Sequence, residues 1–220
     1  MKETLYTIPV NDGFLAGGEC PFCNMWDKLD RDAVQAMLGP AYMEDDVRAE
    51  TDARGFCGQH YKDLMAHGNR LGMALMLYTH VKRAGQNLDN PKEPGKPCYI
   101  CAKVDNTFGR FLDTFFYLWK KDDAMRETVA GGQGFCVPHF RQLMEISASK
   151  LNRRQLQEFS DVIVPLQQRQ MKRLEDELDR FIQKFDYRNA DMPWETAKDA
   201  LPRGIQKAAS IRAIERGRDK

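Results

Sequence analysis

The stretch Cys20-Pro21-Phe22-Cys23 and its later partner Gly55-Phe56-Cys57-Gly58-Gln59-His60 decide the fold expected for this chain of 220 residues. Both stretches return further on, as Cys98-Tyr99-Ile100-Cys101 and Gly134-Phe135-Cys136-Val137-Pro138-His139. The C-x-x-C piece is displaced by 78 positions and the G-F-C-x-x-H piece by 79, so one inserted residue reconciles the two repeats. The chain therefore contains an internal duplication of a Cys3His set.

The spacing within each piece suits metal ligands. A C-x-x-C turn brings two thiolates to one point, and C-x-x-H in the first turn of a helix places a cysteine and a histidine on one helix face. The helix N-terminus carries positive partial charge, which favours thiolate over thiol. All six cysteines and two of the four histidines of the chain fall within these pieces, which is a strong metal signal. We expect two tetrahedral sites, one from Cys20, Cys23, Cys57 and His60 and one from Cys98, Cys101, Cys136 and His139.

Four protein ligands form a closed site, which favours structural Zn2+ and leaves no position for water or substrate. Three thiolates and one histidine can also hold an iron–sulfur cluster, so an electron-transfer or cluster-carrier protein is the alternative. A covalent haem is excluded because Asn24 and Ala102 stand where C-x-x-C-H needs its histidine. The plainest alternative, buried thiols that pack as small apolar groups, does not explain eight positions repeated at a near-constant offset.

The motif Cys20-Pro21-Phe22-Cys23 also resembles the active-site motif of glutaredoxins, which implies a thiol oxidoreductase as a second alternative. Such a dithiol needs a βαβ context, with its first cysteine exposed at a helix start. The surrounding sequence is helical instead, and the motif leaves Cys57 and His60 unexplained. No Ser/His/Asp set, paired catalytic carboxylates or dinucleotide fingerprint stands out, so no catalytic residue is assigned.

Composition bounds the class of protein. The chain carries 33 Lys and Arg against 32 Asp and Glu, and this near-neutral balance offers no electrostatic basis for binding nucleic acid. There is no run of about 18 apolar residues that could span a bilayer, and the N-terminus lacks the pattern of a signal peptide. We expect a cytoplasmic protein, where thiols stay reduced.

Helical periodicity dominates, so the sequence predicts an all-α protein made of two tandem repeats and a C-terminal helical extension. Only residues 5–10 look like a strand. The expected segments are 1–90 and 91–150 for the repeats and 151–220 for C-terminal helices that pack on both, forming one globular unit. Helices are expected at 22–37, 41–53, 57–85 and 98–120, then, after a short segment at 122–130, from 136, at 156–185 with a kink or break at Pro165, and from Trp194.

Several side chains outside the ligand sets keep two interpretations. His67 and His80 follow His60 on the predicted helix 57–85 and are expected to be ordinary helical histidines. The aromatic run from Phe108 to Trp119 belongs either to the core or to a partner surface. A homodimer or a protein partner is expected to use the apolar surface that the core leaves over.

The duplicated C-P-F-C and G-F-C-x-x-H arrangement, with Tyr61 and Phe140 directly after the two histidines, resembles a little-characterised prokaryotic family of unknown function. The C-terminal stretch from Pro193 to Ala200 resembles it too. The resemblance covers nearly the whole chain and implies no established activity.

Overall fold

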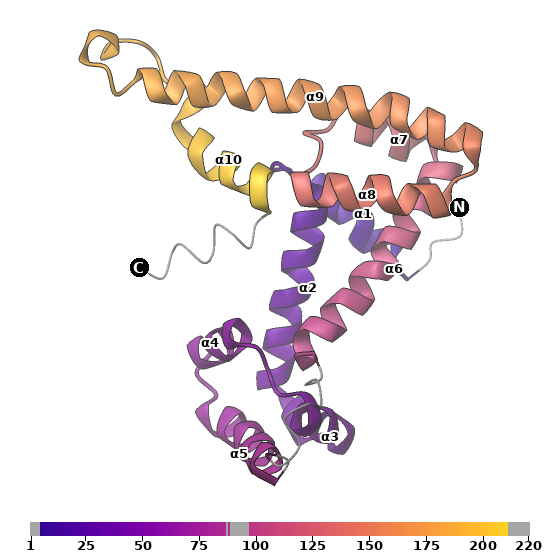
Figure 1. Cartoon of the computed structure of the whole chain (residues 1–220), viewed down its shortest axis with the longest axis vertical. Helices are drawn as coiled ribbons and strands as arrows, with labels where there is room; N and C mark the ends of the chain where they lie inside the picture. The colour runs from indigo at the N-terminus through magenta and orange to yellow at the C-terminus, as the bar shows by residue number, and fades with distance from the viewer. Residues whose placement is uncertain (1–4, 87, 89–96, 211–220) are drawn as a thin grey trace. The chain divides into compact units, whose positions relative to one another are not determined.

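A computed structural model describes residues 5–86, 88 and 97–210, and these residues form helices with no strand among them (Figure 1). The all-α prediction is therefore confirmed. The α-helices are α1 (Thr7–Leu15), α2 (Pro21–Leu38), α3 (Asp45–Arg54), α4 (Gly58–Ala66), α5 (Arg70–Gln86), α6 (Tyr99–Lys121), α7 (Asp123–Ala130), α8 (Val137–Lys150), α9 (Arg153–Gln183) and α10 (Ala200–Ala209), with 3-10 turns at Pro40–Met43, Tyr187–Asn189 and Ala197–Asp199.

The duplication is visible in the order of the helices. In the first repeat, the C-x-x-C piece leads into α2 and the C-x-x-H piece opens α4; in the second, the same pieces lead into α6 and open α8. One short helix follows each long one, α3 after α2 and α7 after α6. The succession α2 to α5 thus corresponds to the succession α6 to α9.

Contacts divide the chain into two compact units. Unit 1 is formed by residues 1–27 and 110–220, and unit 2 by residues 28–109. These units do not coincide with the segments 1–90, 91–150 and 151–220, which stay a prediction about the boundaries of the duplication. In the part of the chain that the structure describes, none of the helices has the length and apolar content that a bilayer crossing requires.

An aromatic core fills unit 1. Phe115 of α6 lies at its centre, fully buried, with ring centroids 5.2 Å from Phe22 and 6.4 Å from Phe159. Trp119 meets Phe159 edge to face at 5.0 Å, and Phe135 lies 5.7 Å from Phe22. The run from Phe108 to Trp119 is therefore core rather than a partner surface, because its phenylalanines and Trp119 are all at most 5% exposed.

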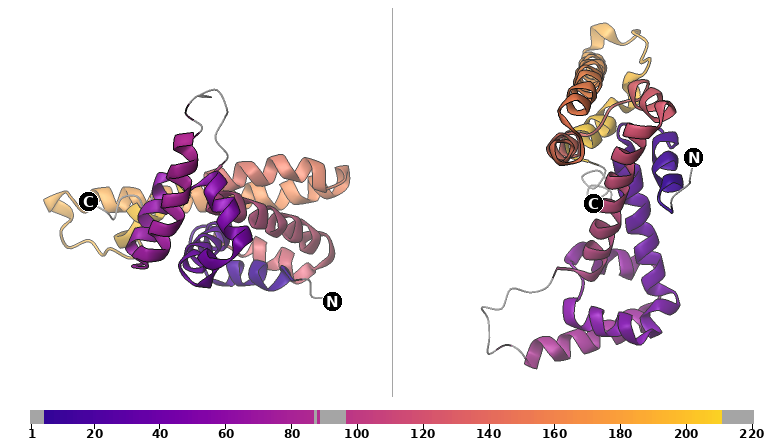
Figure 2. Two further views of the ribbon diagram at one scale, coloured as in Figure 1. Left: turned by 90° about the horizontal axis from the view of Figure 1, so that it is seen from below. Right: turned by 90° about the vertical axis from the view of Figure 1, so that its right-hand side faces the viewer.

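The C-terminal helices belong to unit 1. Helix α9 packs along α8 and is covered by α10, as Figure 1 shows and as Figure 2 (right) shows with α8 and α9 nearly end-on. A capping box at Asn152 and Gln155 starts α9. Pro165 was expected to kink or break this helix, and it does not break α9, which is continuous from Arg153 to Gln183. The burial of Phe159, Ile163 and Leu166 around the proline holds the helical path.

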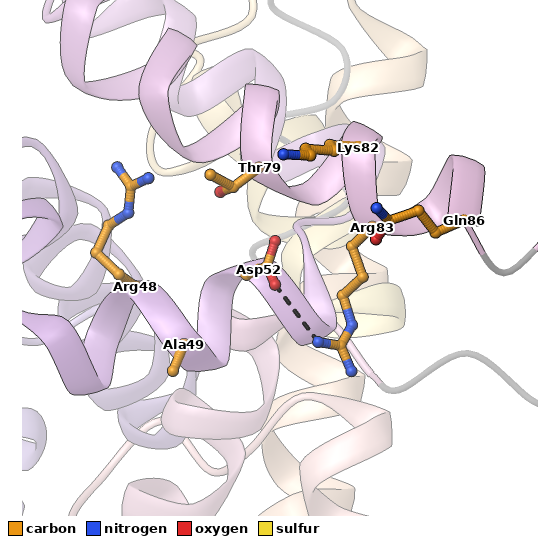
Figure 3. A pocket seen from close by; sticks show the side chains of 7 residues that line it. All are labelled: Arg48, Ala49, Asp52, Thr79, Lys82, Arg83 and Gln86. Atoms are coloured by element: carbon orange, nitrogen blue, oxygen red, sulfur yellow. Dashed lines mark hydrogen bonds and ion pairs between the residues drawn. The ribbon is translucent and has the colours of Figure 1, made fainter.

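Unit 2 differs from expectation in one helix. The sequence predicted one helix over residues 57–85, whereas the structure has α4 and α5 separated at Gly68, whose φ is 89°. Helix α5 packs against α3, and the two frame a pocket of about 360 Å3 (Figure 3). Several apolar side chains of α5 are exposed, with Leu71 and Tyr78 exposed by 68% and 67%.

The strand predicted for residues 5–10 is wrong, because Thr7 to Leu15 form α1. The buried residues of α1 are Thr7, Val10 and Gly13, spaced by three, so a helical face meets the core. Gly13 lies against the Met25 side chain, which leaves no space for a larger residue.

Candidate metal centres

The eight predicted ligands form two clusters, but the pieces pair across the repeats. Each cluster joins a C-x-x-C piece of one repeat to the C-x-x-H piece of the other. The Cys20 cluster consists of Cys20, Cys23, Cys136 and His139, and the Cys57 cluster of Cys57, His60, Cys98 and Cys101. The expected pairing of Cys20 and Cys23 with Cys57 and His60, and of Cys98 and Cys101 with Cys136 and His139, is therefore wrong.

Helix geometry explains the crossed pairing in the first repeat. His60 Nε2 lies 2.9 Å from a carboxylate oxygen of Asp30, so the C-x-x-H piece packs beside α2 at Asp30. Asp30 follows Cys23 by seven residues in the same helix, which is about 10 Å along its axis. His60 therefore joins Cys98 and Cys101, which lie in the same unit, instead of Cys20 and Cys23.

The Cys20 cluster lies in unit 1. Cys20 and Cys23 stand at the start of α2, and Cys136 is the N-cap residue of α8 with His139 in the first turn. His139 Nδ1 lies 3.1, 3.4 and 3.5 Å from the sulfur atoms of Cys136, Cys20 and Cys23. The sulfur atoms of Cys23 and Cys136 are 3.6 Å apart, which is too long for a disulfide.

The Cys57 cluster repeats this arrangement in unit 2. Cys57 is the N-cap residue of α4, and Cys98 and Cys101 stand at the start of α6. His60 Nδ1 lies 3.2 Å from both Cys57 and Cys98 and 3.5 Å from Cys101. The Asp30 carboxylate beside Nε2 orients the ring so that Nδ1 faces the three sulfur atoms.

A glycine with positive φ precedes each C-x-x-H piece. Gly55 has a φ of 59° and Gly134 a φ of 71°. Residues with a Cβ rarely adopt this backbone conformation. A polar side chain from a later helix covers each glycine: His80 of α5 lies against Gly55, and Gln167 of α9 against Gly134. Gln167 also donates to the Phe135 carbonyl and accepts from the Phe135 N–H, at 2.9 and 3.0 Å.

Gly134→Ala is expected to destabilise unit 1 by about 1–3 kcal/mol because the new Cβ would be strained at this φ and would lie 2.9 Å from Gln167 Oε1. Gly109→Ala is the matched control, since Gly109 lies inside α6 with open space around it. That change should stabilise the helix by about 0.5–1 kcal/mol. Denaturant unfolding of both variants measures the difference, and equal midpoints would contradict the assigned backbone role.

Without a cation, few of the thiols in the Cys20 cluster can be ionised at the same time. Burial opposes ionisation of the Cys20 thiol, but hydrogen bonds from Cys136 and Cys23 outweigh it and hold the pKa of Cys20 well below its usual value. The same contacts raise the pKa values of the partner thiols, Cys23 and Cys136. Hydrogen bonding to Cys136 and Cys20 raises the pKa of Cys23, and hydrogen bonding to Cys20 raises the pKa of Cys136 to about 12.

The Cys57 cluster titrates in the same manner. Burial opposes the charged form of His60, but its hydrogen bonds to Asp30 and Cys98 raise the pKa of His60 to about 10. Burial likewise opposes the Cys98 thiolate, yet His60 lowers the pKa of Cys98 to about 6. Burial and the neighbouring sulfur charges raise the pKa of Cys101 to about 12. Three thiolates at this separation need a cation to be ionised together.

A buried ion cluster that the sequence analysis missed adjoins the Cys20 cluster. Lys207 of α10 is 1% exposed, and its ammonium donates to the backbone carbonyl of Glu19 at 2.9 Å and to that of Gln133. The same ammonium lies 3.1 Å from the Glu19 carboxylate, which also pairs with Arg173 at 2.7 Å and Arg203 at 3.2 Å. Lys207 thereby joins the residue before Cys20 to the residue before Gly134. No short sequence pattern distinguishes this lysine from a solvated one, because the carbonyls that bind it lie 188 and 74 residues away.

The two clusters differ in burial. Cys20, Cys23 and Cys136 are each 0% exposed. In the Cys57 cluster all three cysteines are half-buried, and only His60 is fully covered. Solvent and solutes therefore reach the sulfur atoms of the Cys57 cluster more easily.

Neither of the two other histidines belongs to a cluster. His67 is exposed at the C-terminal end of α4. His80 Nδ1 donates to the Asp52 carbonyl at 2.8 Å, so this side chain ties α5 to α3 while covering Gly55. A third group of ligand-type atoms, Asp30, His60 and Asp63, shares His60 with the Cys57 cluster. Its Asp30 serves to orient His60.

Comparison with known proteins gives a family and no activity. The model of a family described as "Family of unknown function (DUF6062)" matches residues 1–96 and again residues 89–214. The two matches follow the internal duplication and confirm the resemblance seen in the sequence. No curated protein and no solved structure matches the chain.

Proposed function

The chain belongs to this family of unknown function, DUF6062, and we propose that it is a cytoplasmic metal-binding scaffold in which two Zn2+ ions close the Cys20 and Cys57 clusters. The metals serve structure rather than catalysis, and the helices they hold present surfaces for protein interaction. The ligand geometry carries the proposal.

The separations within each cluster match the edges of a tetrahedron around one ion. Tetrahedral Zn2+ with sulfur at about 2.3 Å and nitrogen at about 2.05 Å places two sulfur atoms about 3.8 Å apart and a sulfur and a nitrogen about 3.5 Å apart. One sulfur–sulfur pair in each cluster is separated by 3.6 Å (Cys23 and Cys136) and 3.9 Å (Cys57 and Cys101), and the sulfur–nitrogen distances run from 3.1 to 3.5 Å. One ion can therefore contact all four ligands of a cluster.

The same distances favour a single ion over an iron–sulfur cluster. All ligand atoms of each set lie within 4.8 Å of one another, whereas the ligands of a polynuclear cluster attach to different irons with sulfide between them. Burial also opposes a thiol oxidoreductase. A reactive cysteine must be partly exposed to reach a disulfide substrate, and both Cys20 and Cys23 are 0% exposed.

Elemental analysis of protein purified under reducing, anaerobic conditions tests the proposal. We expect two zinc ions per chain and a colourless solution. Brown protein with visible absorbance would instead support iron–sulfur clusters. Protein with full helical content and no bound metal would overturn the proposal.

The difference in burial predicts stepwise metal release. With excess of a chromogenic zinc chelator, we expect one ion to leave the half-buried Cys57 cluster at least about tenfold faster than the other leaves the buried Cys20 cluster, because exchange needs access to the sulfur atoms. Absorbance of the chelator complex follows both phases. Asp30→Asn should accelerate the fast phase alone, since outer-sphere partners of a metal-bound histidine change metal affinity about 10–100-fold. A single phase of two equivalents would contradict the assignment.

A further inference from the structure

Helix α5 is apolar on two opposite faces. One face packs into unit 2 through the buried Gly72, Met73 and Met76. The other carries Leu71, Leu75, Tyr78 and Val81, which are exposed by 68%, 37%, 67% and 58%. A helix that is apolar all round is normally covered on both sides, so this exposed stripe indicates an interaction surface.

Positive charge borders the stripe. Helix α5 contains Arg70, Lys82 and Arg83 and no acidic residue. Lys82 and Arg83 line the pocket between α3 and α5, together with Arg48 from α3 (Figure 3). One carboxylate lies among them, that of Asp52, which is 3.5 Å from Arg83. A surface that covers the stripe must therefore be apolar and flanked by negative charge.

The chain itself has a groove of that kind in unit 1. It lies between α9 and α10 and has a volume of about 690 Å3. Its apolar floor contains Met171, Leu174, Leu178 and Ile182, of which Met171 and Ile182 are 40% and 66% exposed. Three carboxylates line the groove against one exposed ammonium, and these charged side chains are Glu175, Asp176, Asp179 and Lys172. Lys207 also lines the groove, but its ammonium is paired with the Glu19 carboxylate.

The stripe and the floor also match in length. Leu71 to Val81 and Met171 to Ile182 each span three helical turns, about 15 Å. Both present apolar side chains at spacings of three and four residues, as a helix laid in a groove requires. Their flanking charges are opposite in sign.

We propose that α5 of one chain docks into the α9–α10 groove of a second copy of the same chain. This proposal makes a second copy of the chain the partner in the interaction role proposed above, and it rests on that proposed function. Two chains that each offer a helix and a groove make two such contacts in a closed dimer, and an open assembly forms when only one contact is made per pair.

Sedimentation of the metal-loaded full chain over a range of protein concentrations tests this contact. The wild-type chain should self-associate as concentration rises, and more strongly at low ionic strength. Arg70→Glu with Lys82→Glu, and separately Asp176→Lys with Asp179→Lys, should each raise the concentration for half association by about tenfold, as expected for two reversed surface charge pairs. Leu71→Ser with Tyr78→Ser should abolish association.

Mixing decides whether helix and groove meet each other. The helix variant and the groove variant carry complementary reversed charges, so an equimolar mixture should recover association near the wild-type level. Leu15→Ser, at a residue 79% exposed, and Lys121→Glu with Arg153→Glu, at exposed positions of α6 and α9, are controls that should leave association unchanged.

A wild-type chain that stays monomeric at every concentration would overturn the docking proposal, and so would variants that do not rescue each other. Metal content is measured on the same samples. Two ions per chain in a monomeric protein would reject docking alone, whereas absence of metal would reject the scaffold itself.

Discussion

A chain with both Cys57→Ser and Cys101→Ser is expected to retain one metal ion, and a chain with both Cys57→Ser and Cys20→Ser is expected to retain none. The first pair damages only the Cys57 cluster and leaves the other cluster intact beside the aromatic core. The second pair damages both clusters. An intact structural zinc site has an apparent binding free energy of about 10–16 kcal/mol. Removing a thiolate ligand takes away part of this binding free energy, so the damaged cluster is expected to lose its ion on dilution. Elemental analysis after gel filtration under reducing conditions gives the count.

These two variants separate the crossed arrangement from pairing within each repeat. If Cys20 and Cys23 shared an ion with Cys57 and His60, the counts would be reversed. His67→Ala is a suitable control because His67 is an exposed histidine outside both clusters. It should keep two ions, and loss of an ion there would show that the counts report general damage instead of ligand identity.

The second large effect concerns the buried ammonium of α10. Lys207→Met should destabilise unit 1 by about 3–5 kcal/mol, the cost of removing one partner from a buried ion pair. The change leaves the Glu19 and Gln133 carbonyls without this donor and removes one of three cations from the Glu19 carboxylate. Denaturant unfolding measures the loss. The Cys20 cluster should also release its metal faster, since Lys207 joins the two segments that carry its ligands.

Lys172→Met provides the comparison. Lys172 pairs with Glu175 and Asp176 at 2.9 Å, but its side chain is 62% exposed, and solvent screens such surface pairs so that they add little to stability. It should leave both stability and metal release close to wild type. If the two lysine variants were equally mild, Lys207 would not act as a buried clamp.

Features fixed by short stretches of sequence could be predicted. The eight ligand-type residues were recognised because spacing within a turn places Cys and His on one face whatever the rest of the chain does. Gly55 and Gly134 belong to the repeated motif because a positive φ is a local demand that favours glycine. The helical class followed from periodicity over long segments such as 98–120.

Features that depend on contacts between distant parts of the chain could not be predicted from the sequence. Two C-x-x-C pieces can be joined to two C-x-x-H pieces in two ways, and the spacing of 33 or 34 residues between pieces of one repeat permits either. The choice is made by where α4 packs along α2, beside Asp30. The same limit applies to Lys207, whose burial depends on backbone carbonyls 188 and 74 residues away.

Local patterns also gave wrong elements where burial overrode them. Residues 5–10 resemble a strand by composition, but Thr7, Val10 and Gly13 form a buried helical face. Helix α9 passes Pro165 because its neighbours Phe159, Ile163 and Leu166 are held in the core. The predicted helix 57–85 is divided into α4 and α5, and several apolar side chains of α5 face outward.

The crossed pairing makes the clusters nested along the chain, and this has a consequence for synthesis on the ribosome. The ligands of the inner cluster are complete once residue 101 has emerged, whereas the outer cluster needs Cys136 and His139 as well. Translation at about 5–20 residues per second separates the two moments by roughly 2–8 s. Cys20 and Cys23, although made first, must wait as free thiols in the nascent chain until the inner metal site can already have closed. If both clusters bind metal as proposed, the inner cluster can therefore take up its ion before the ligands of the outer cluster are complete.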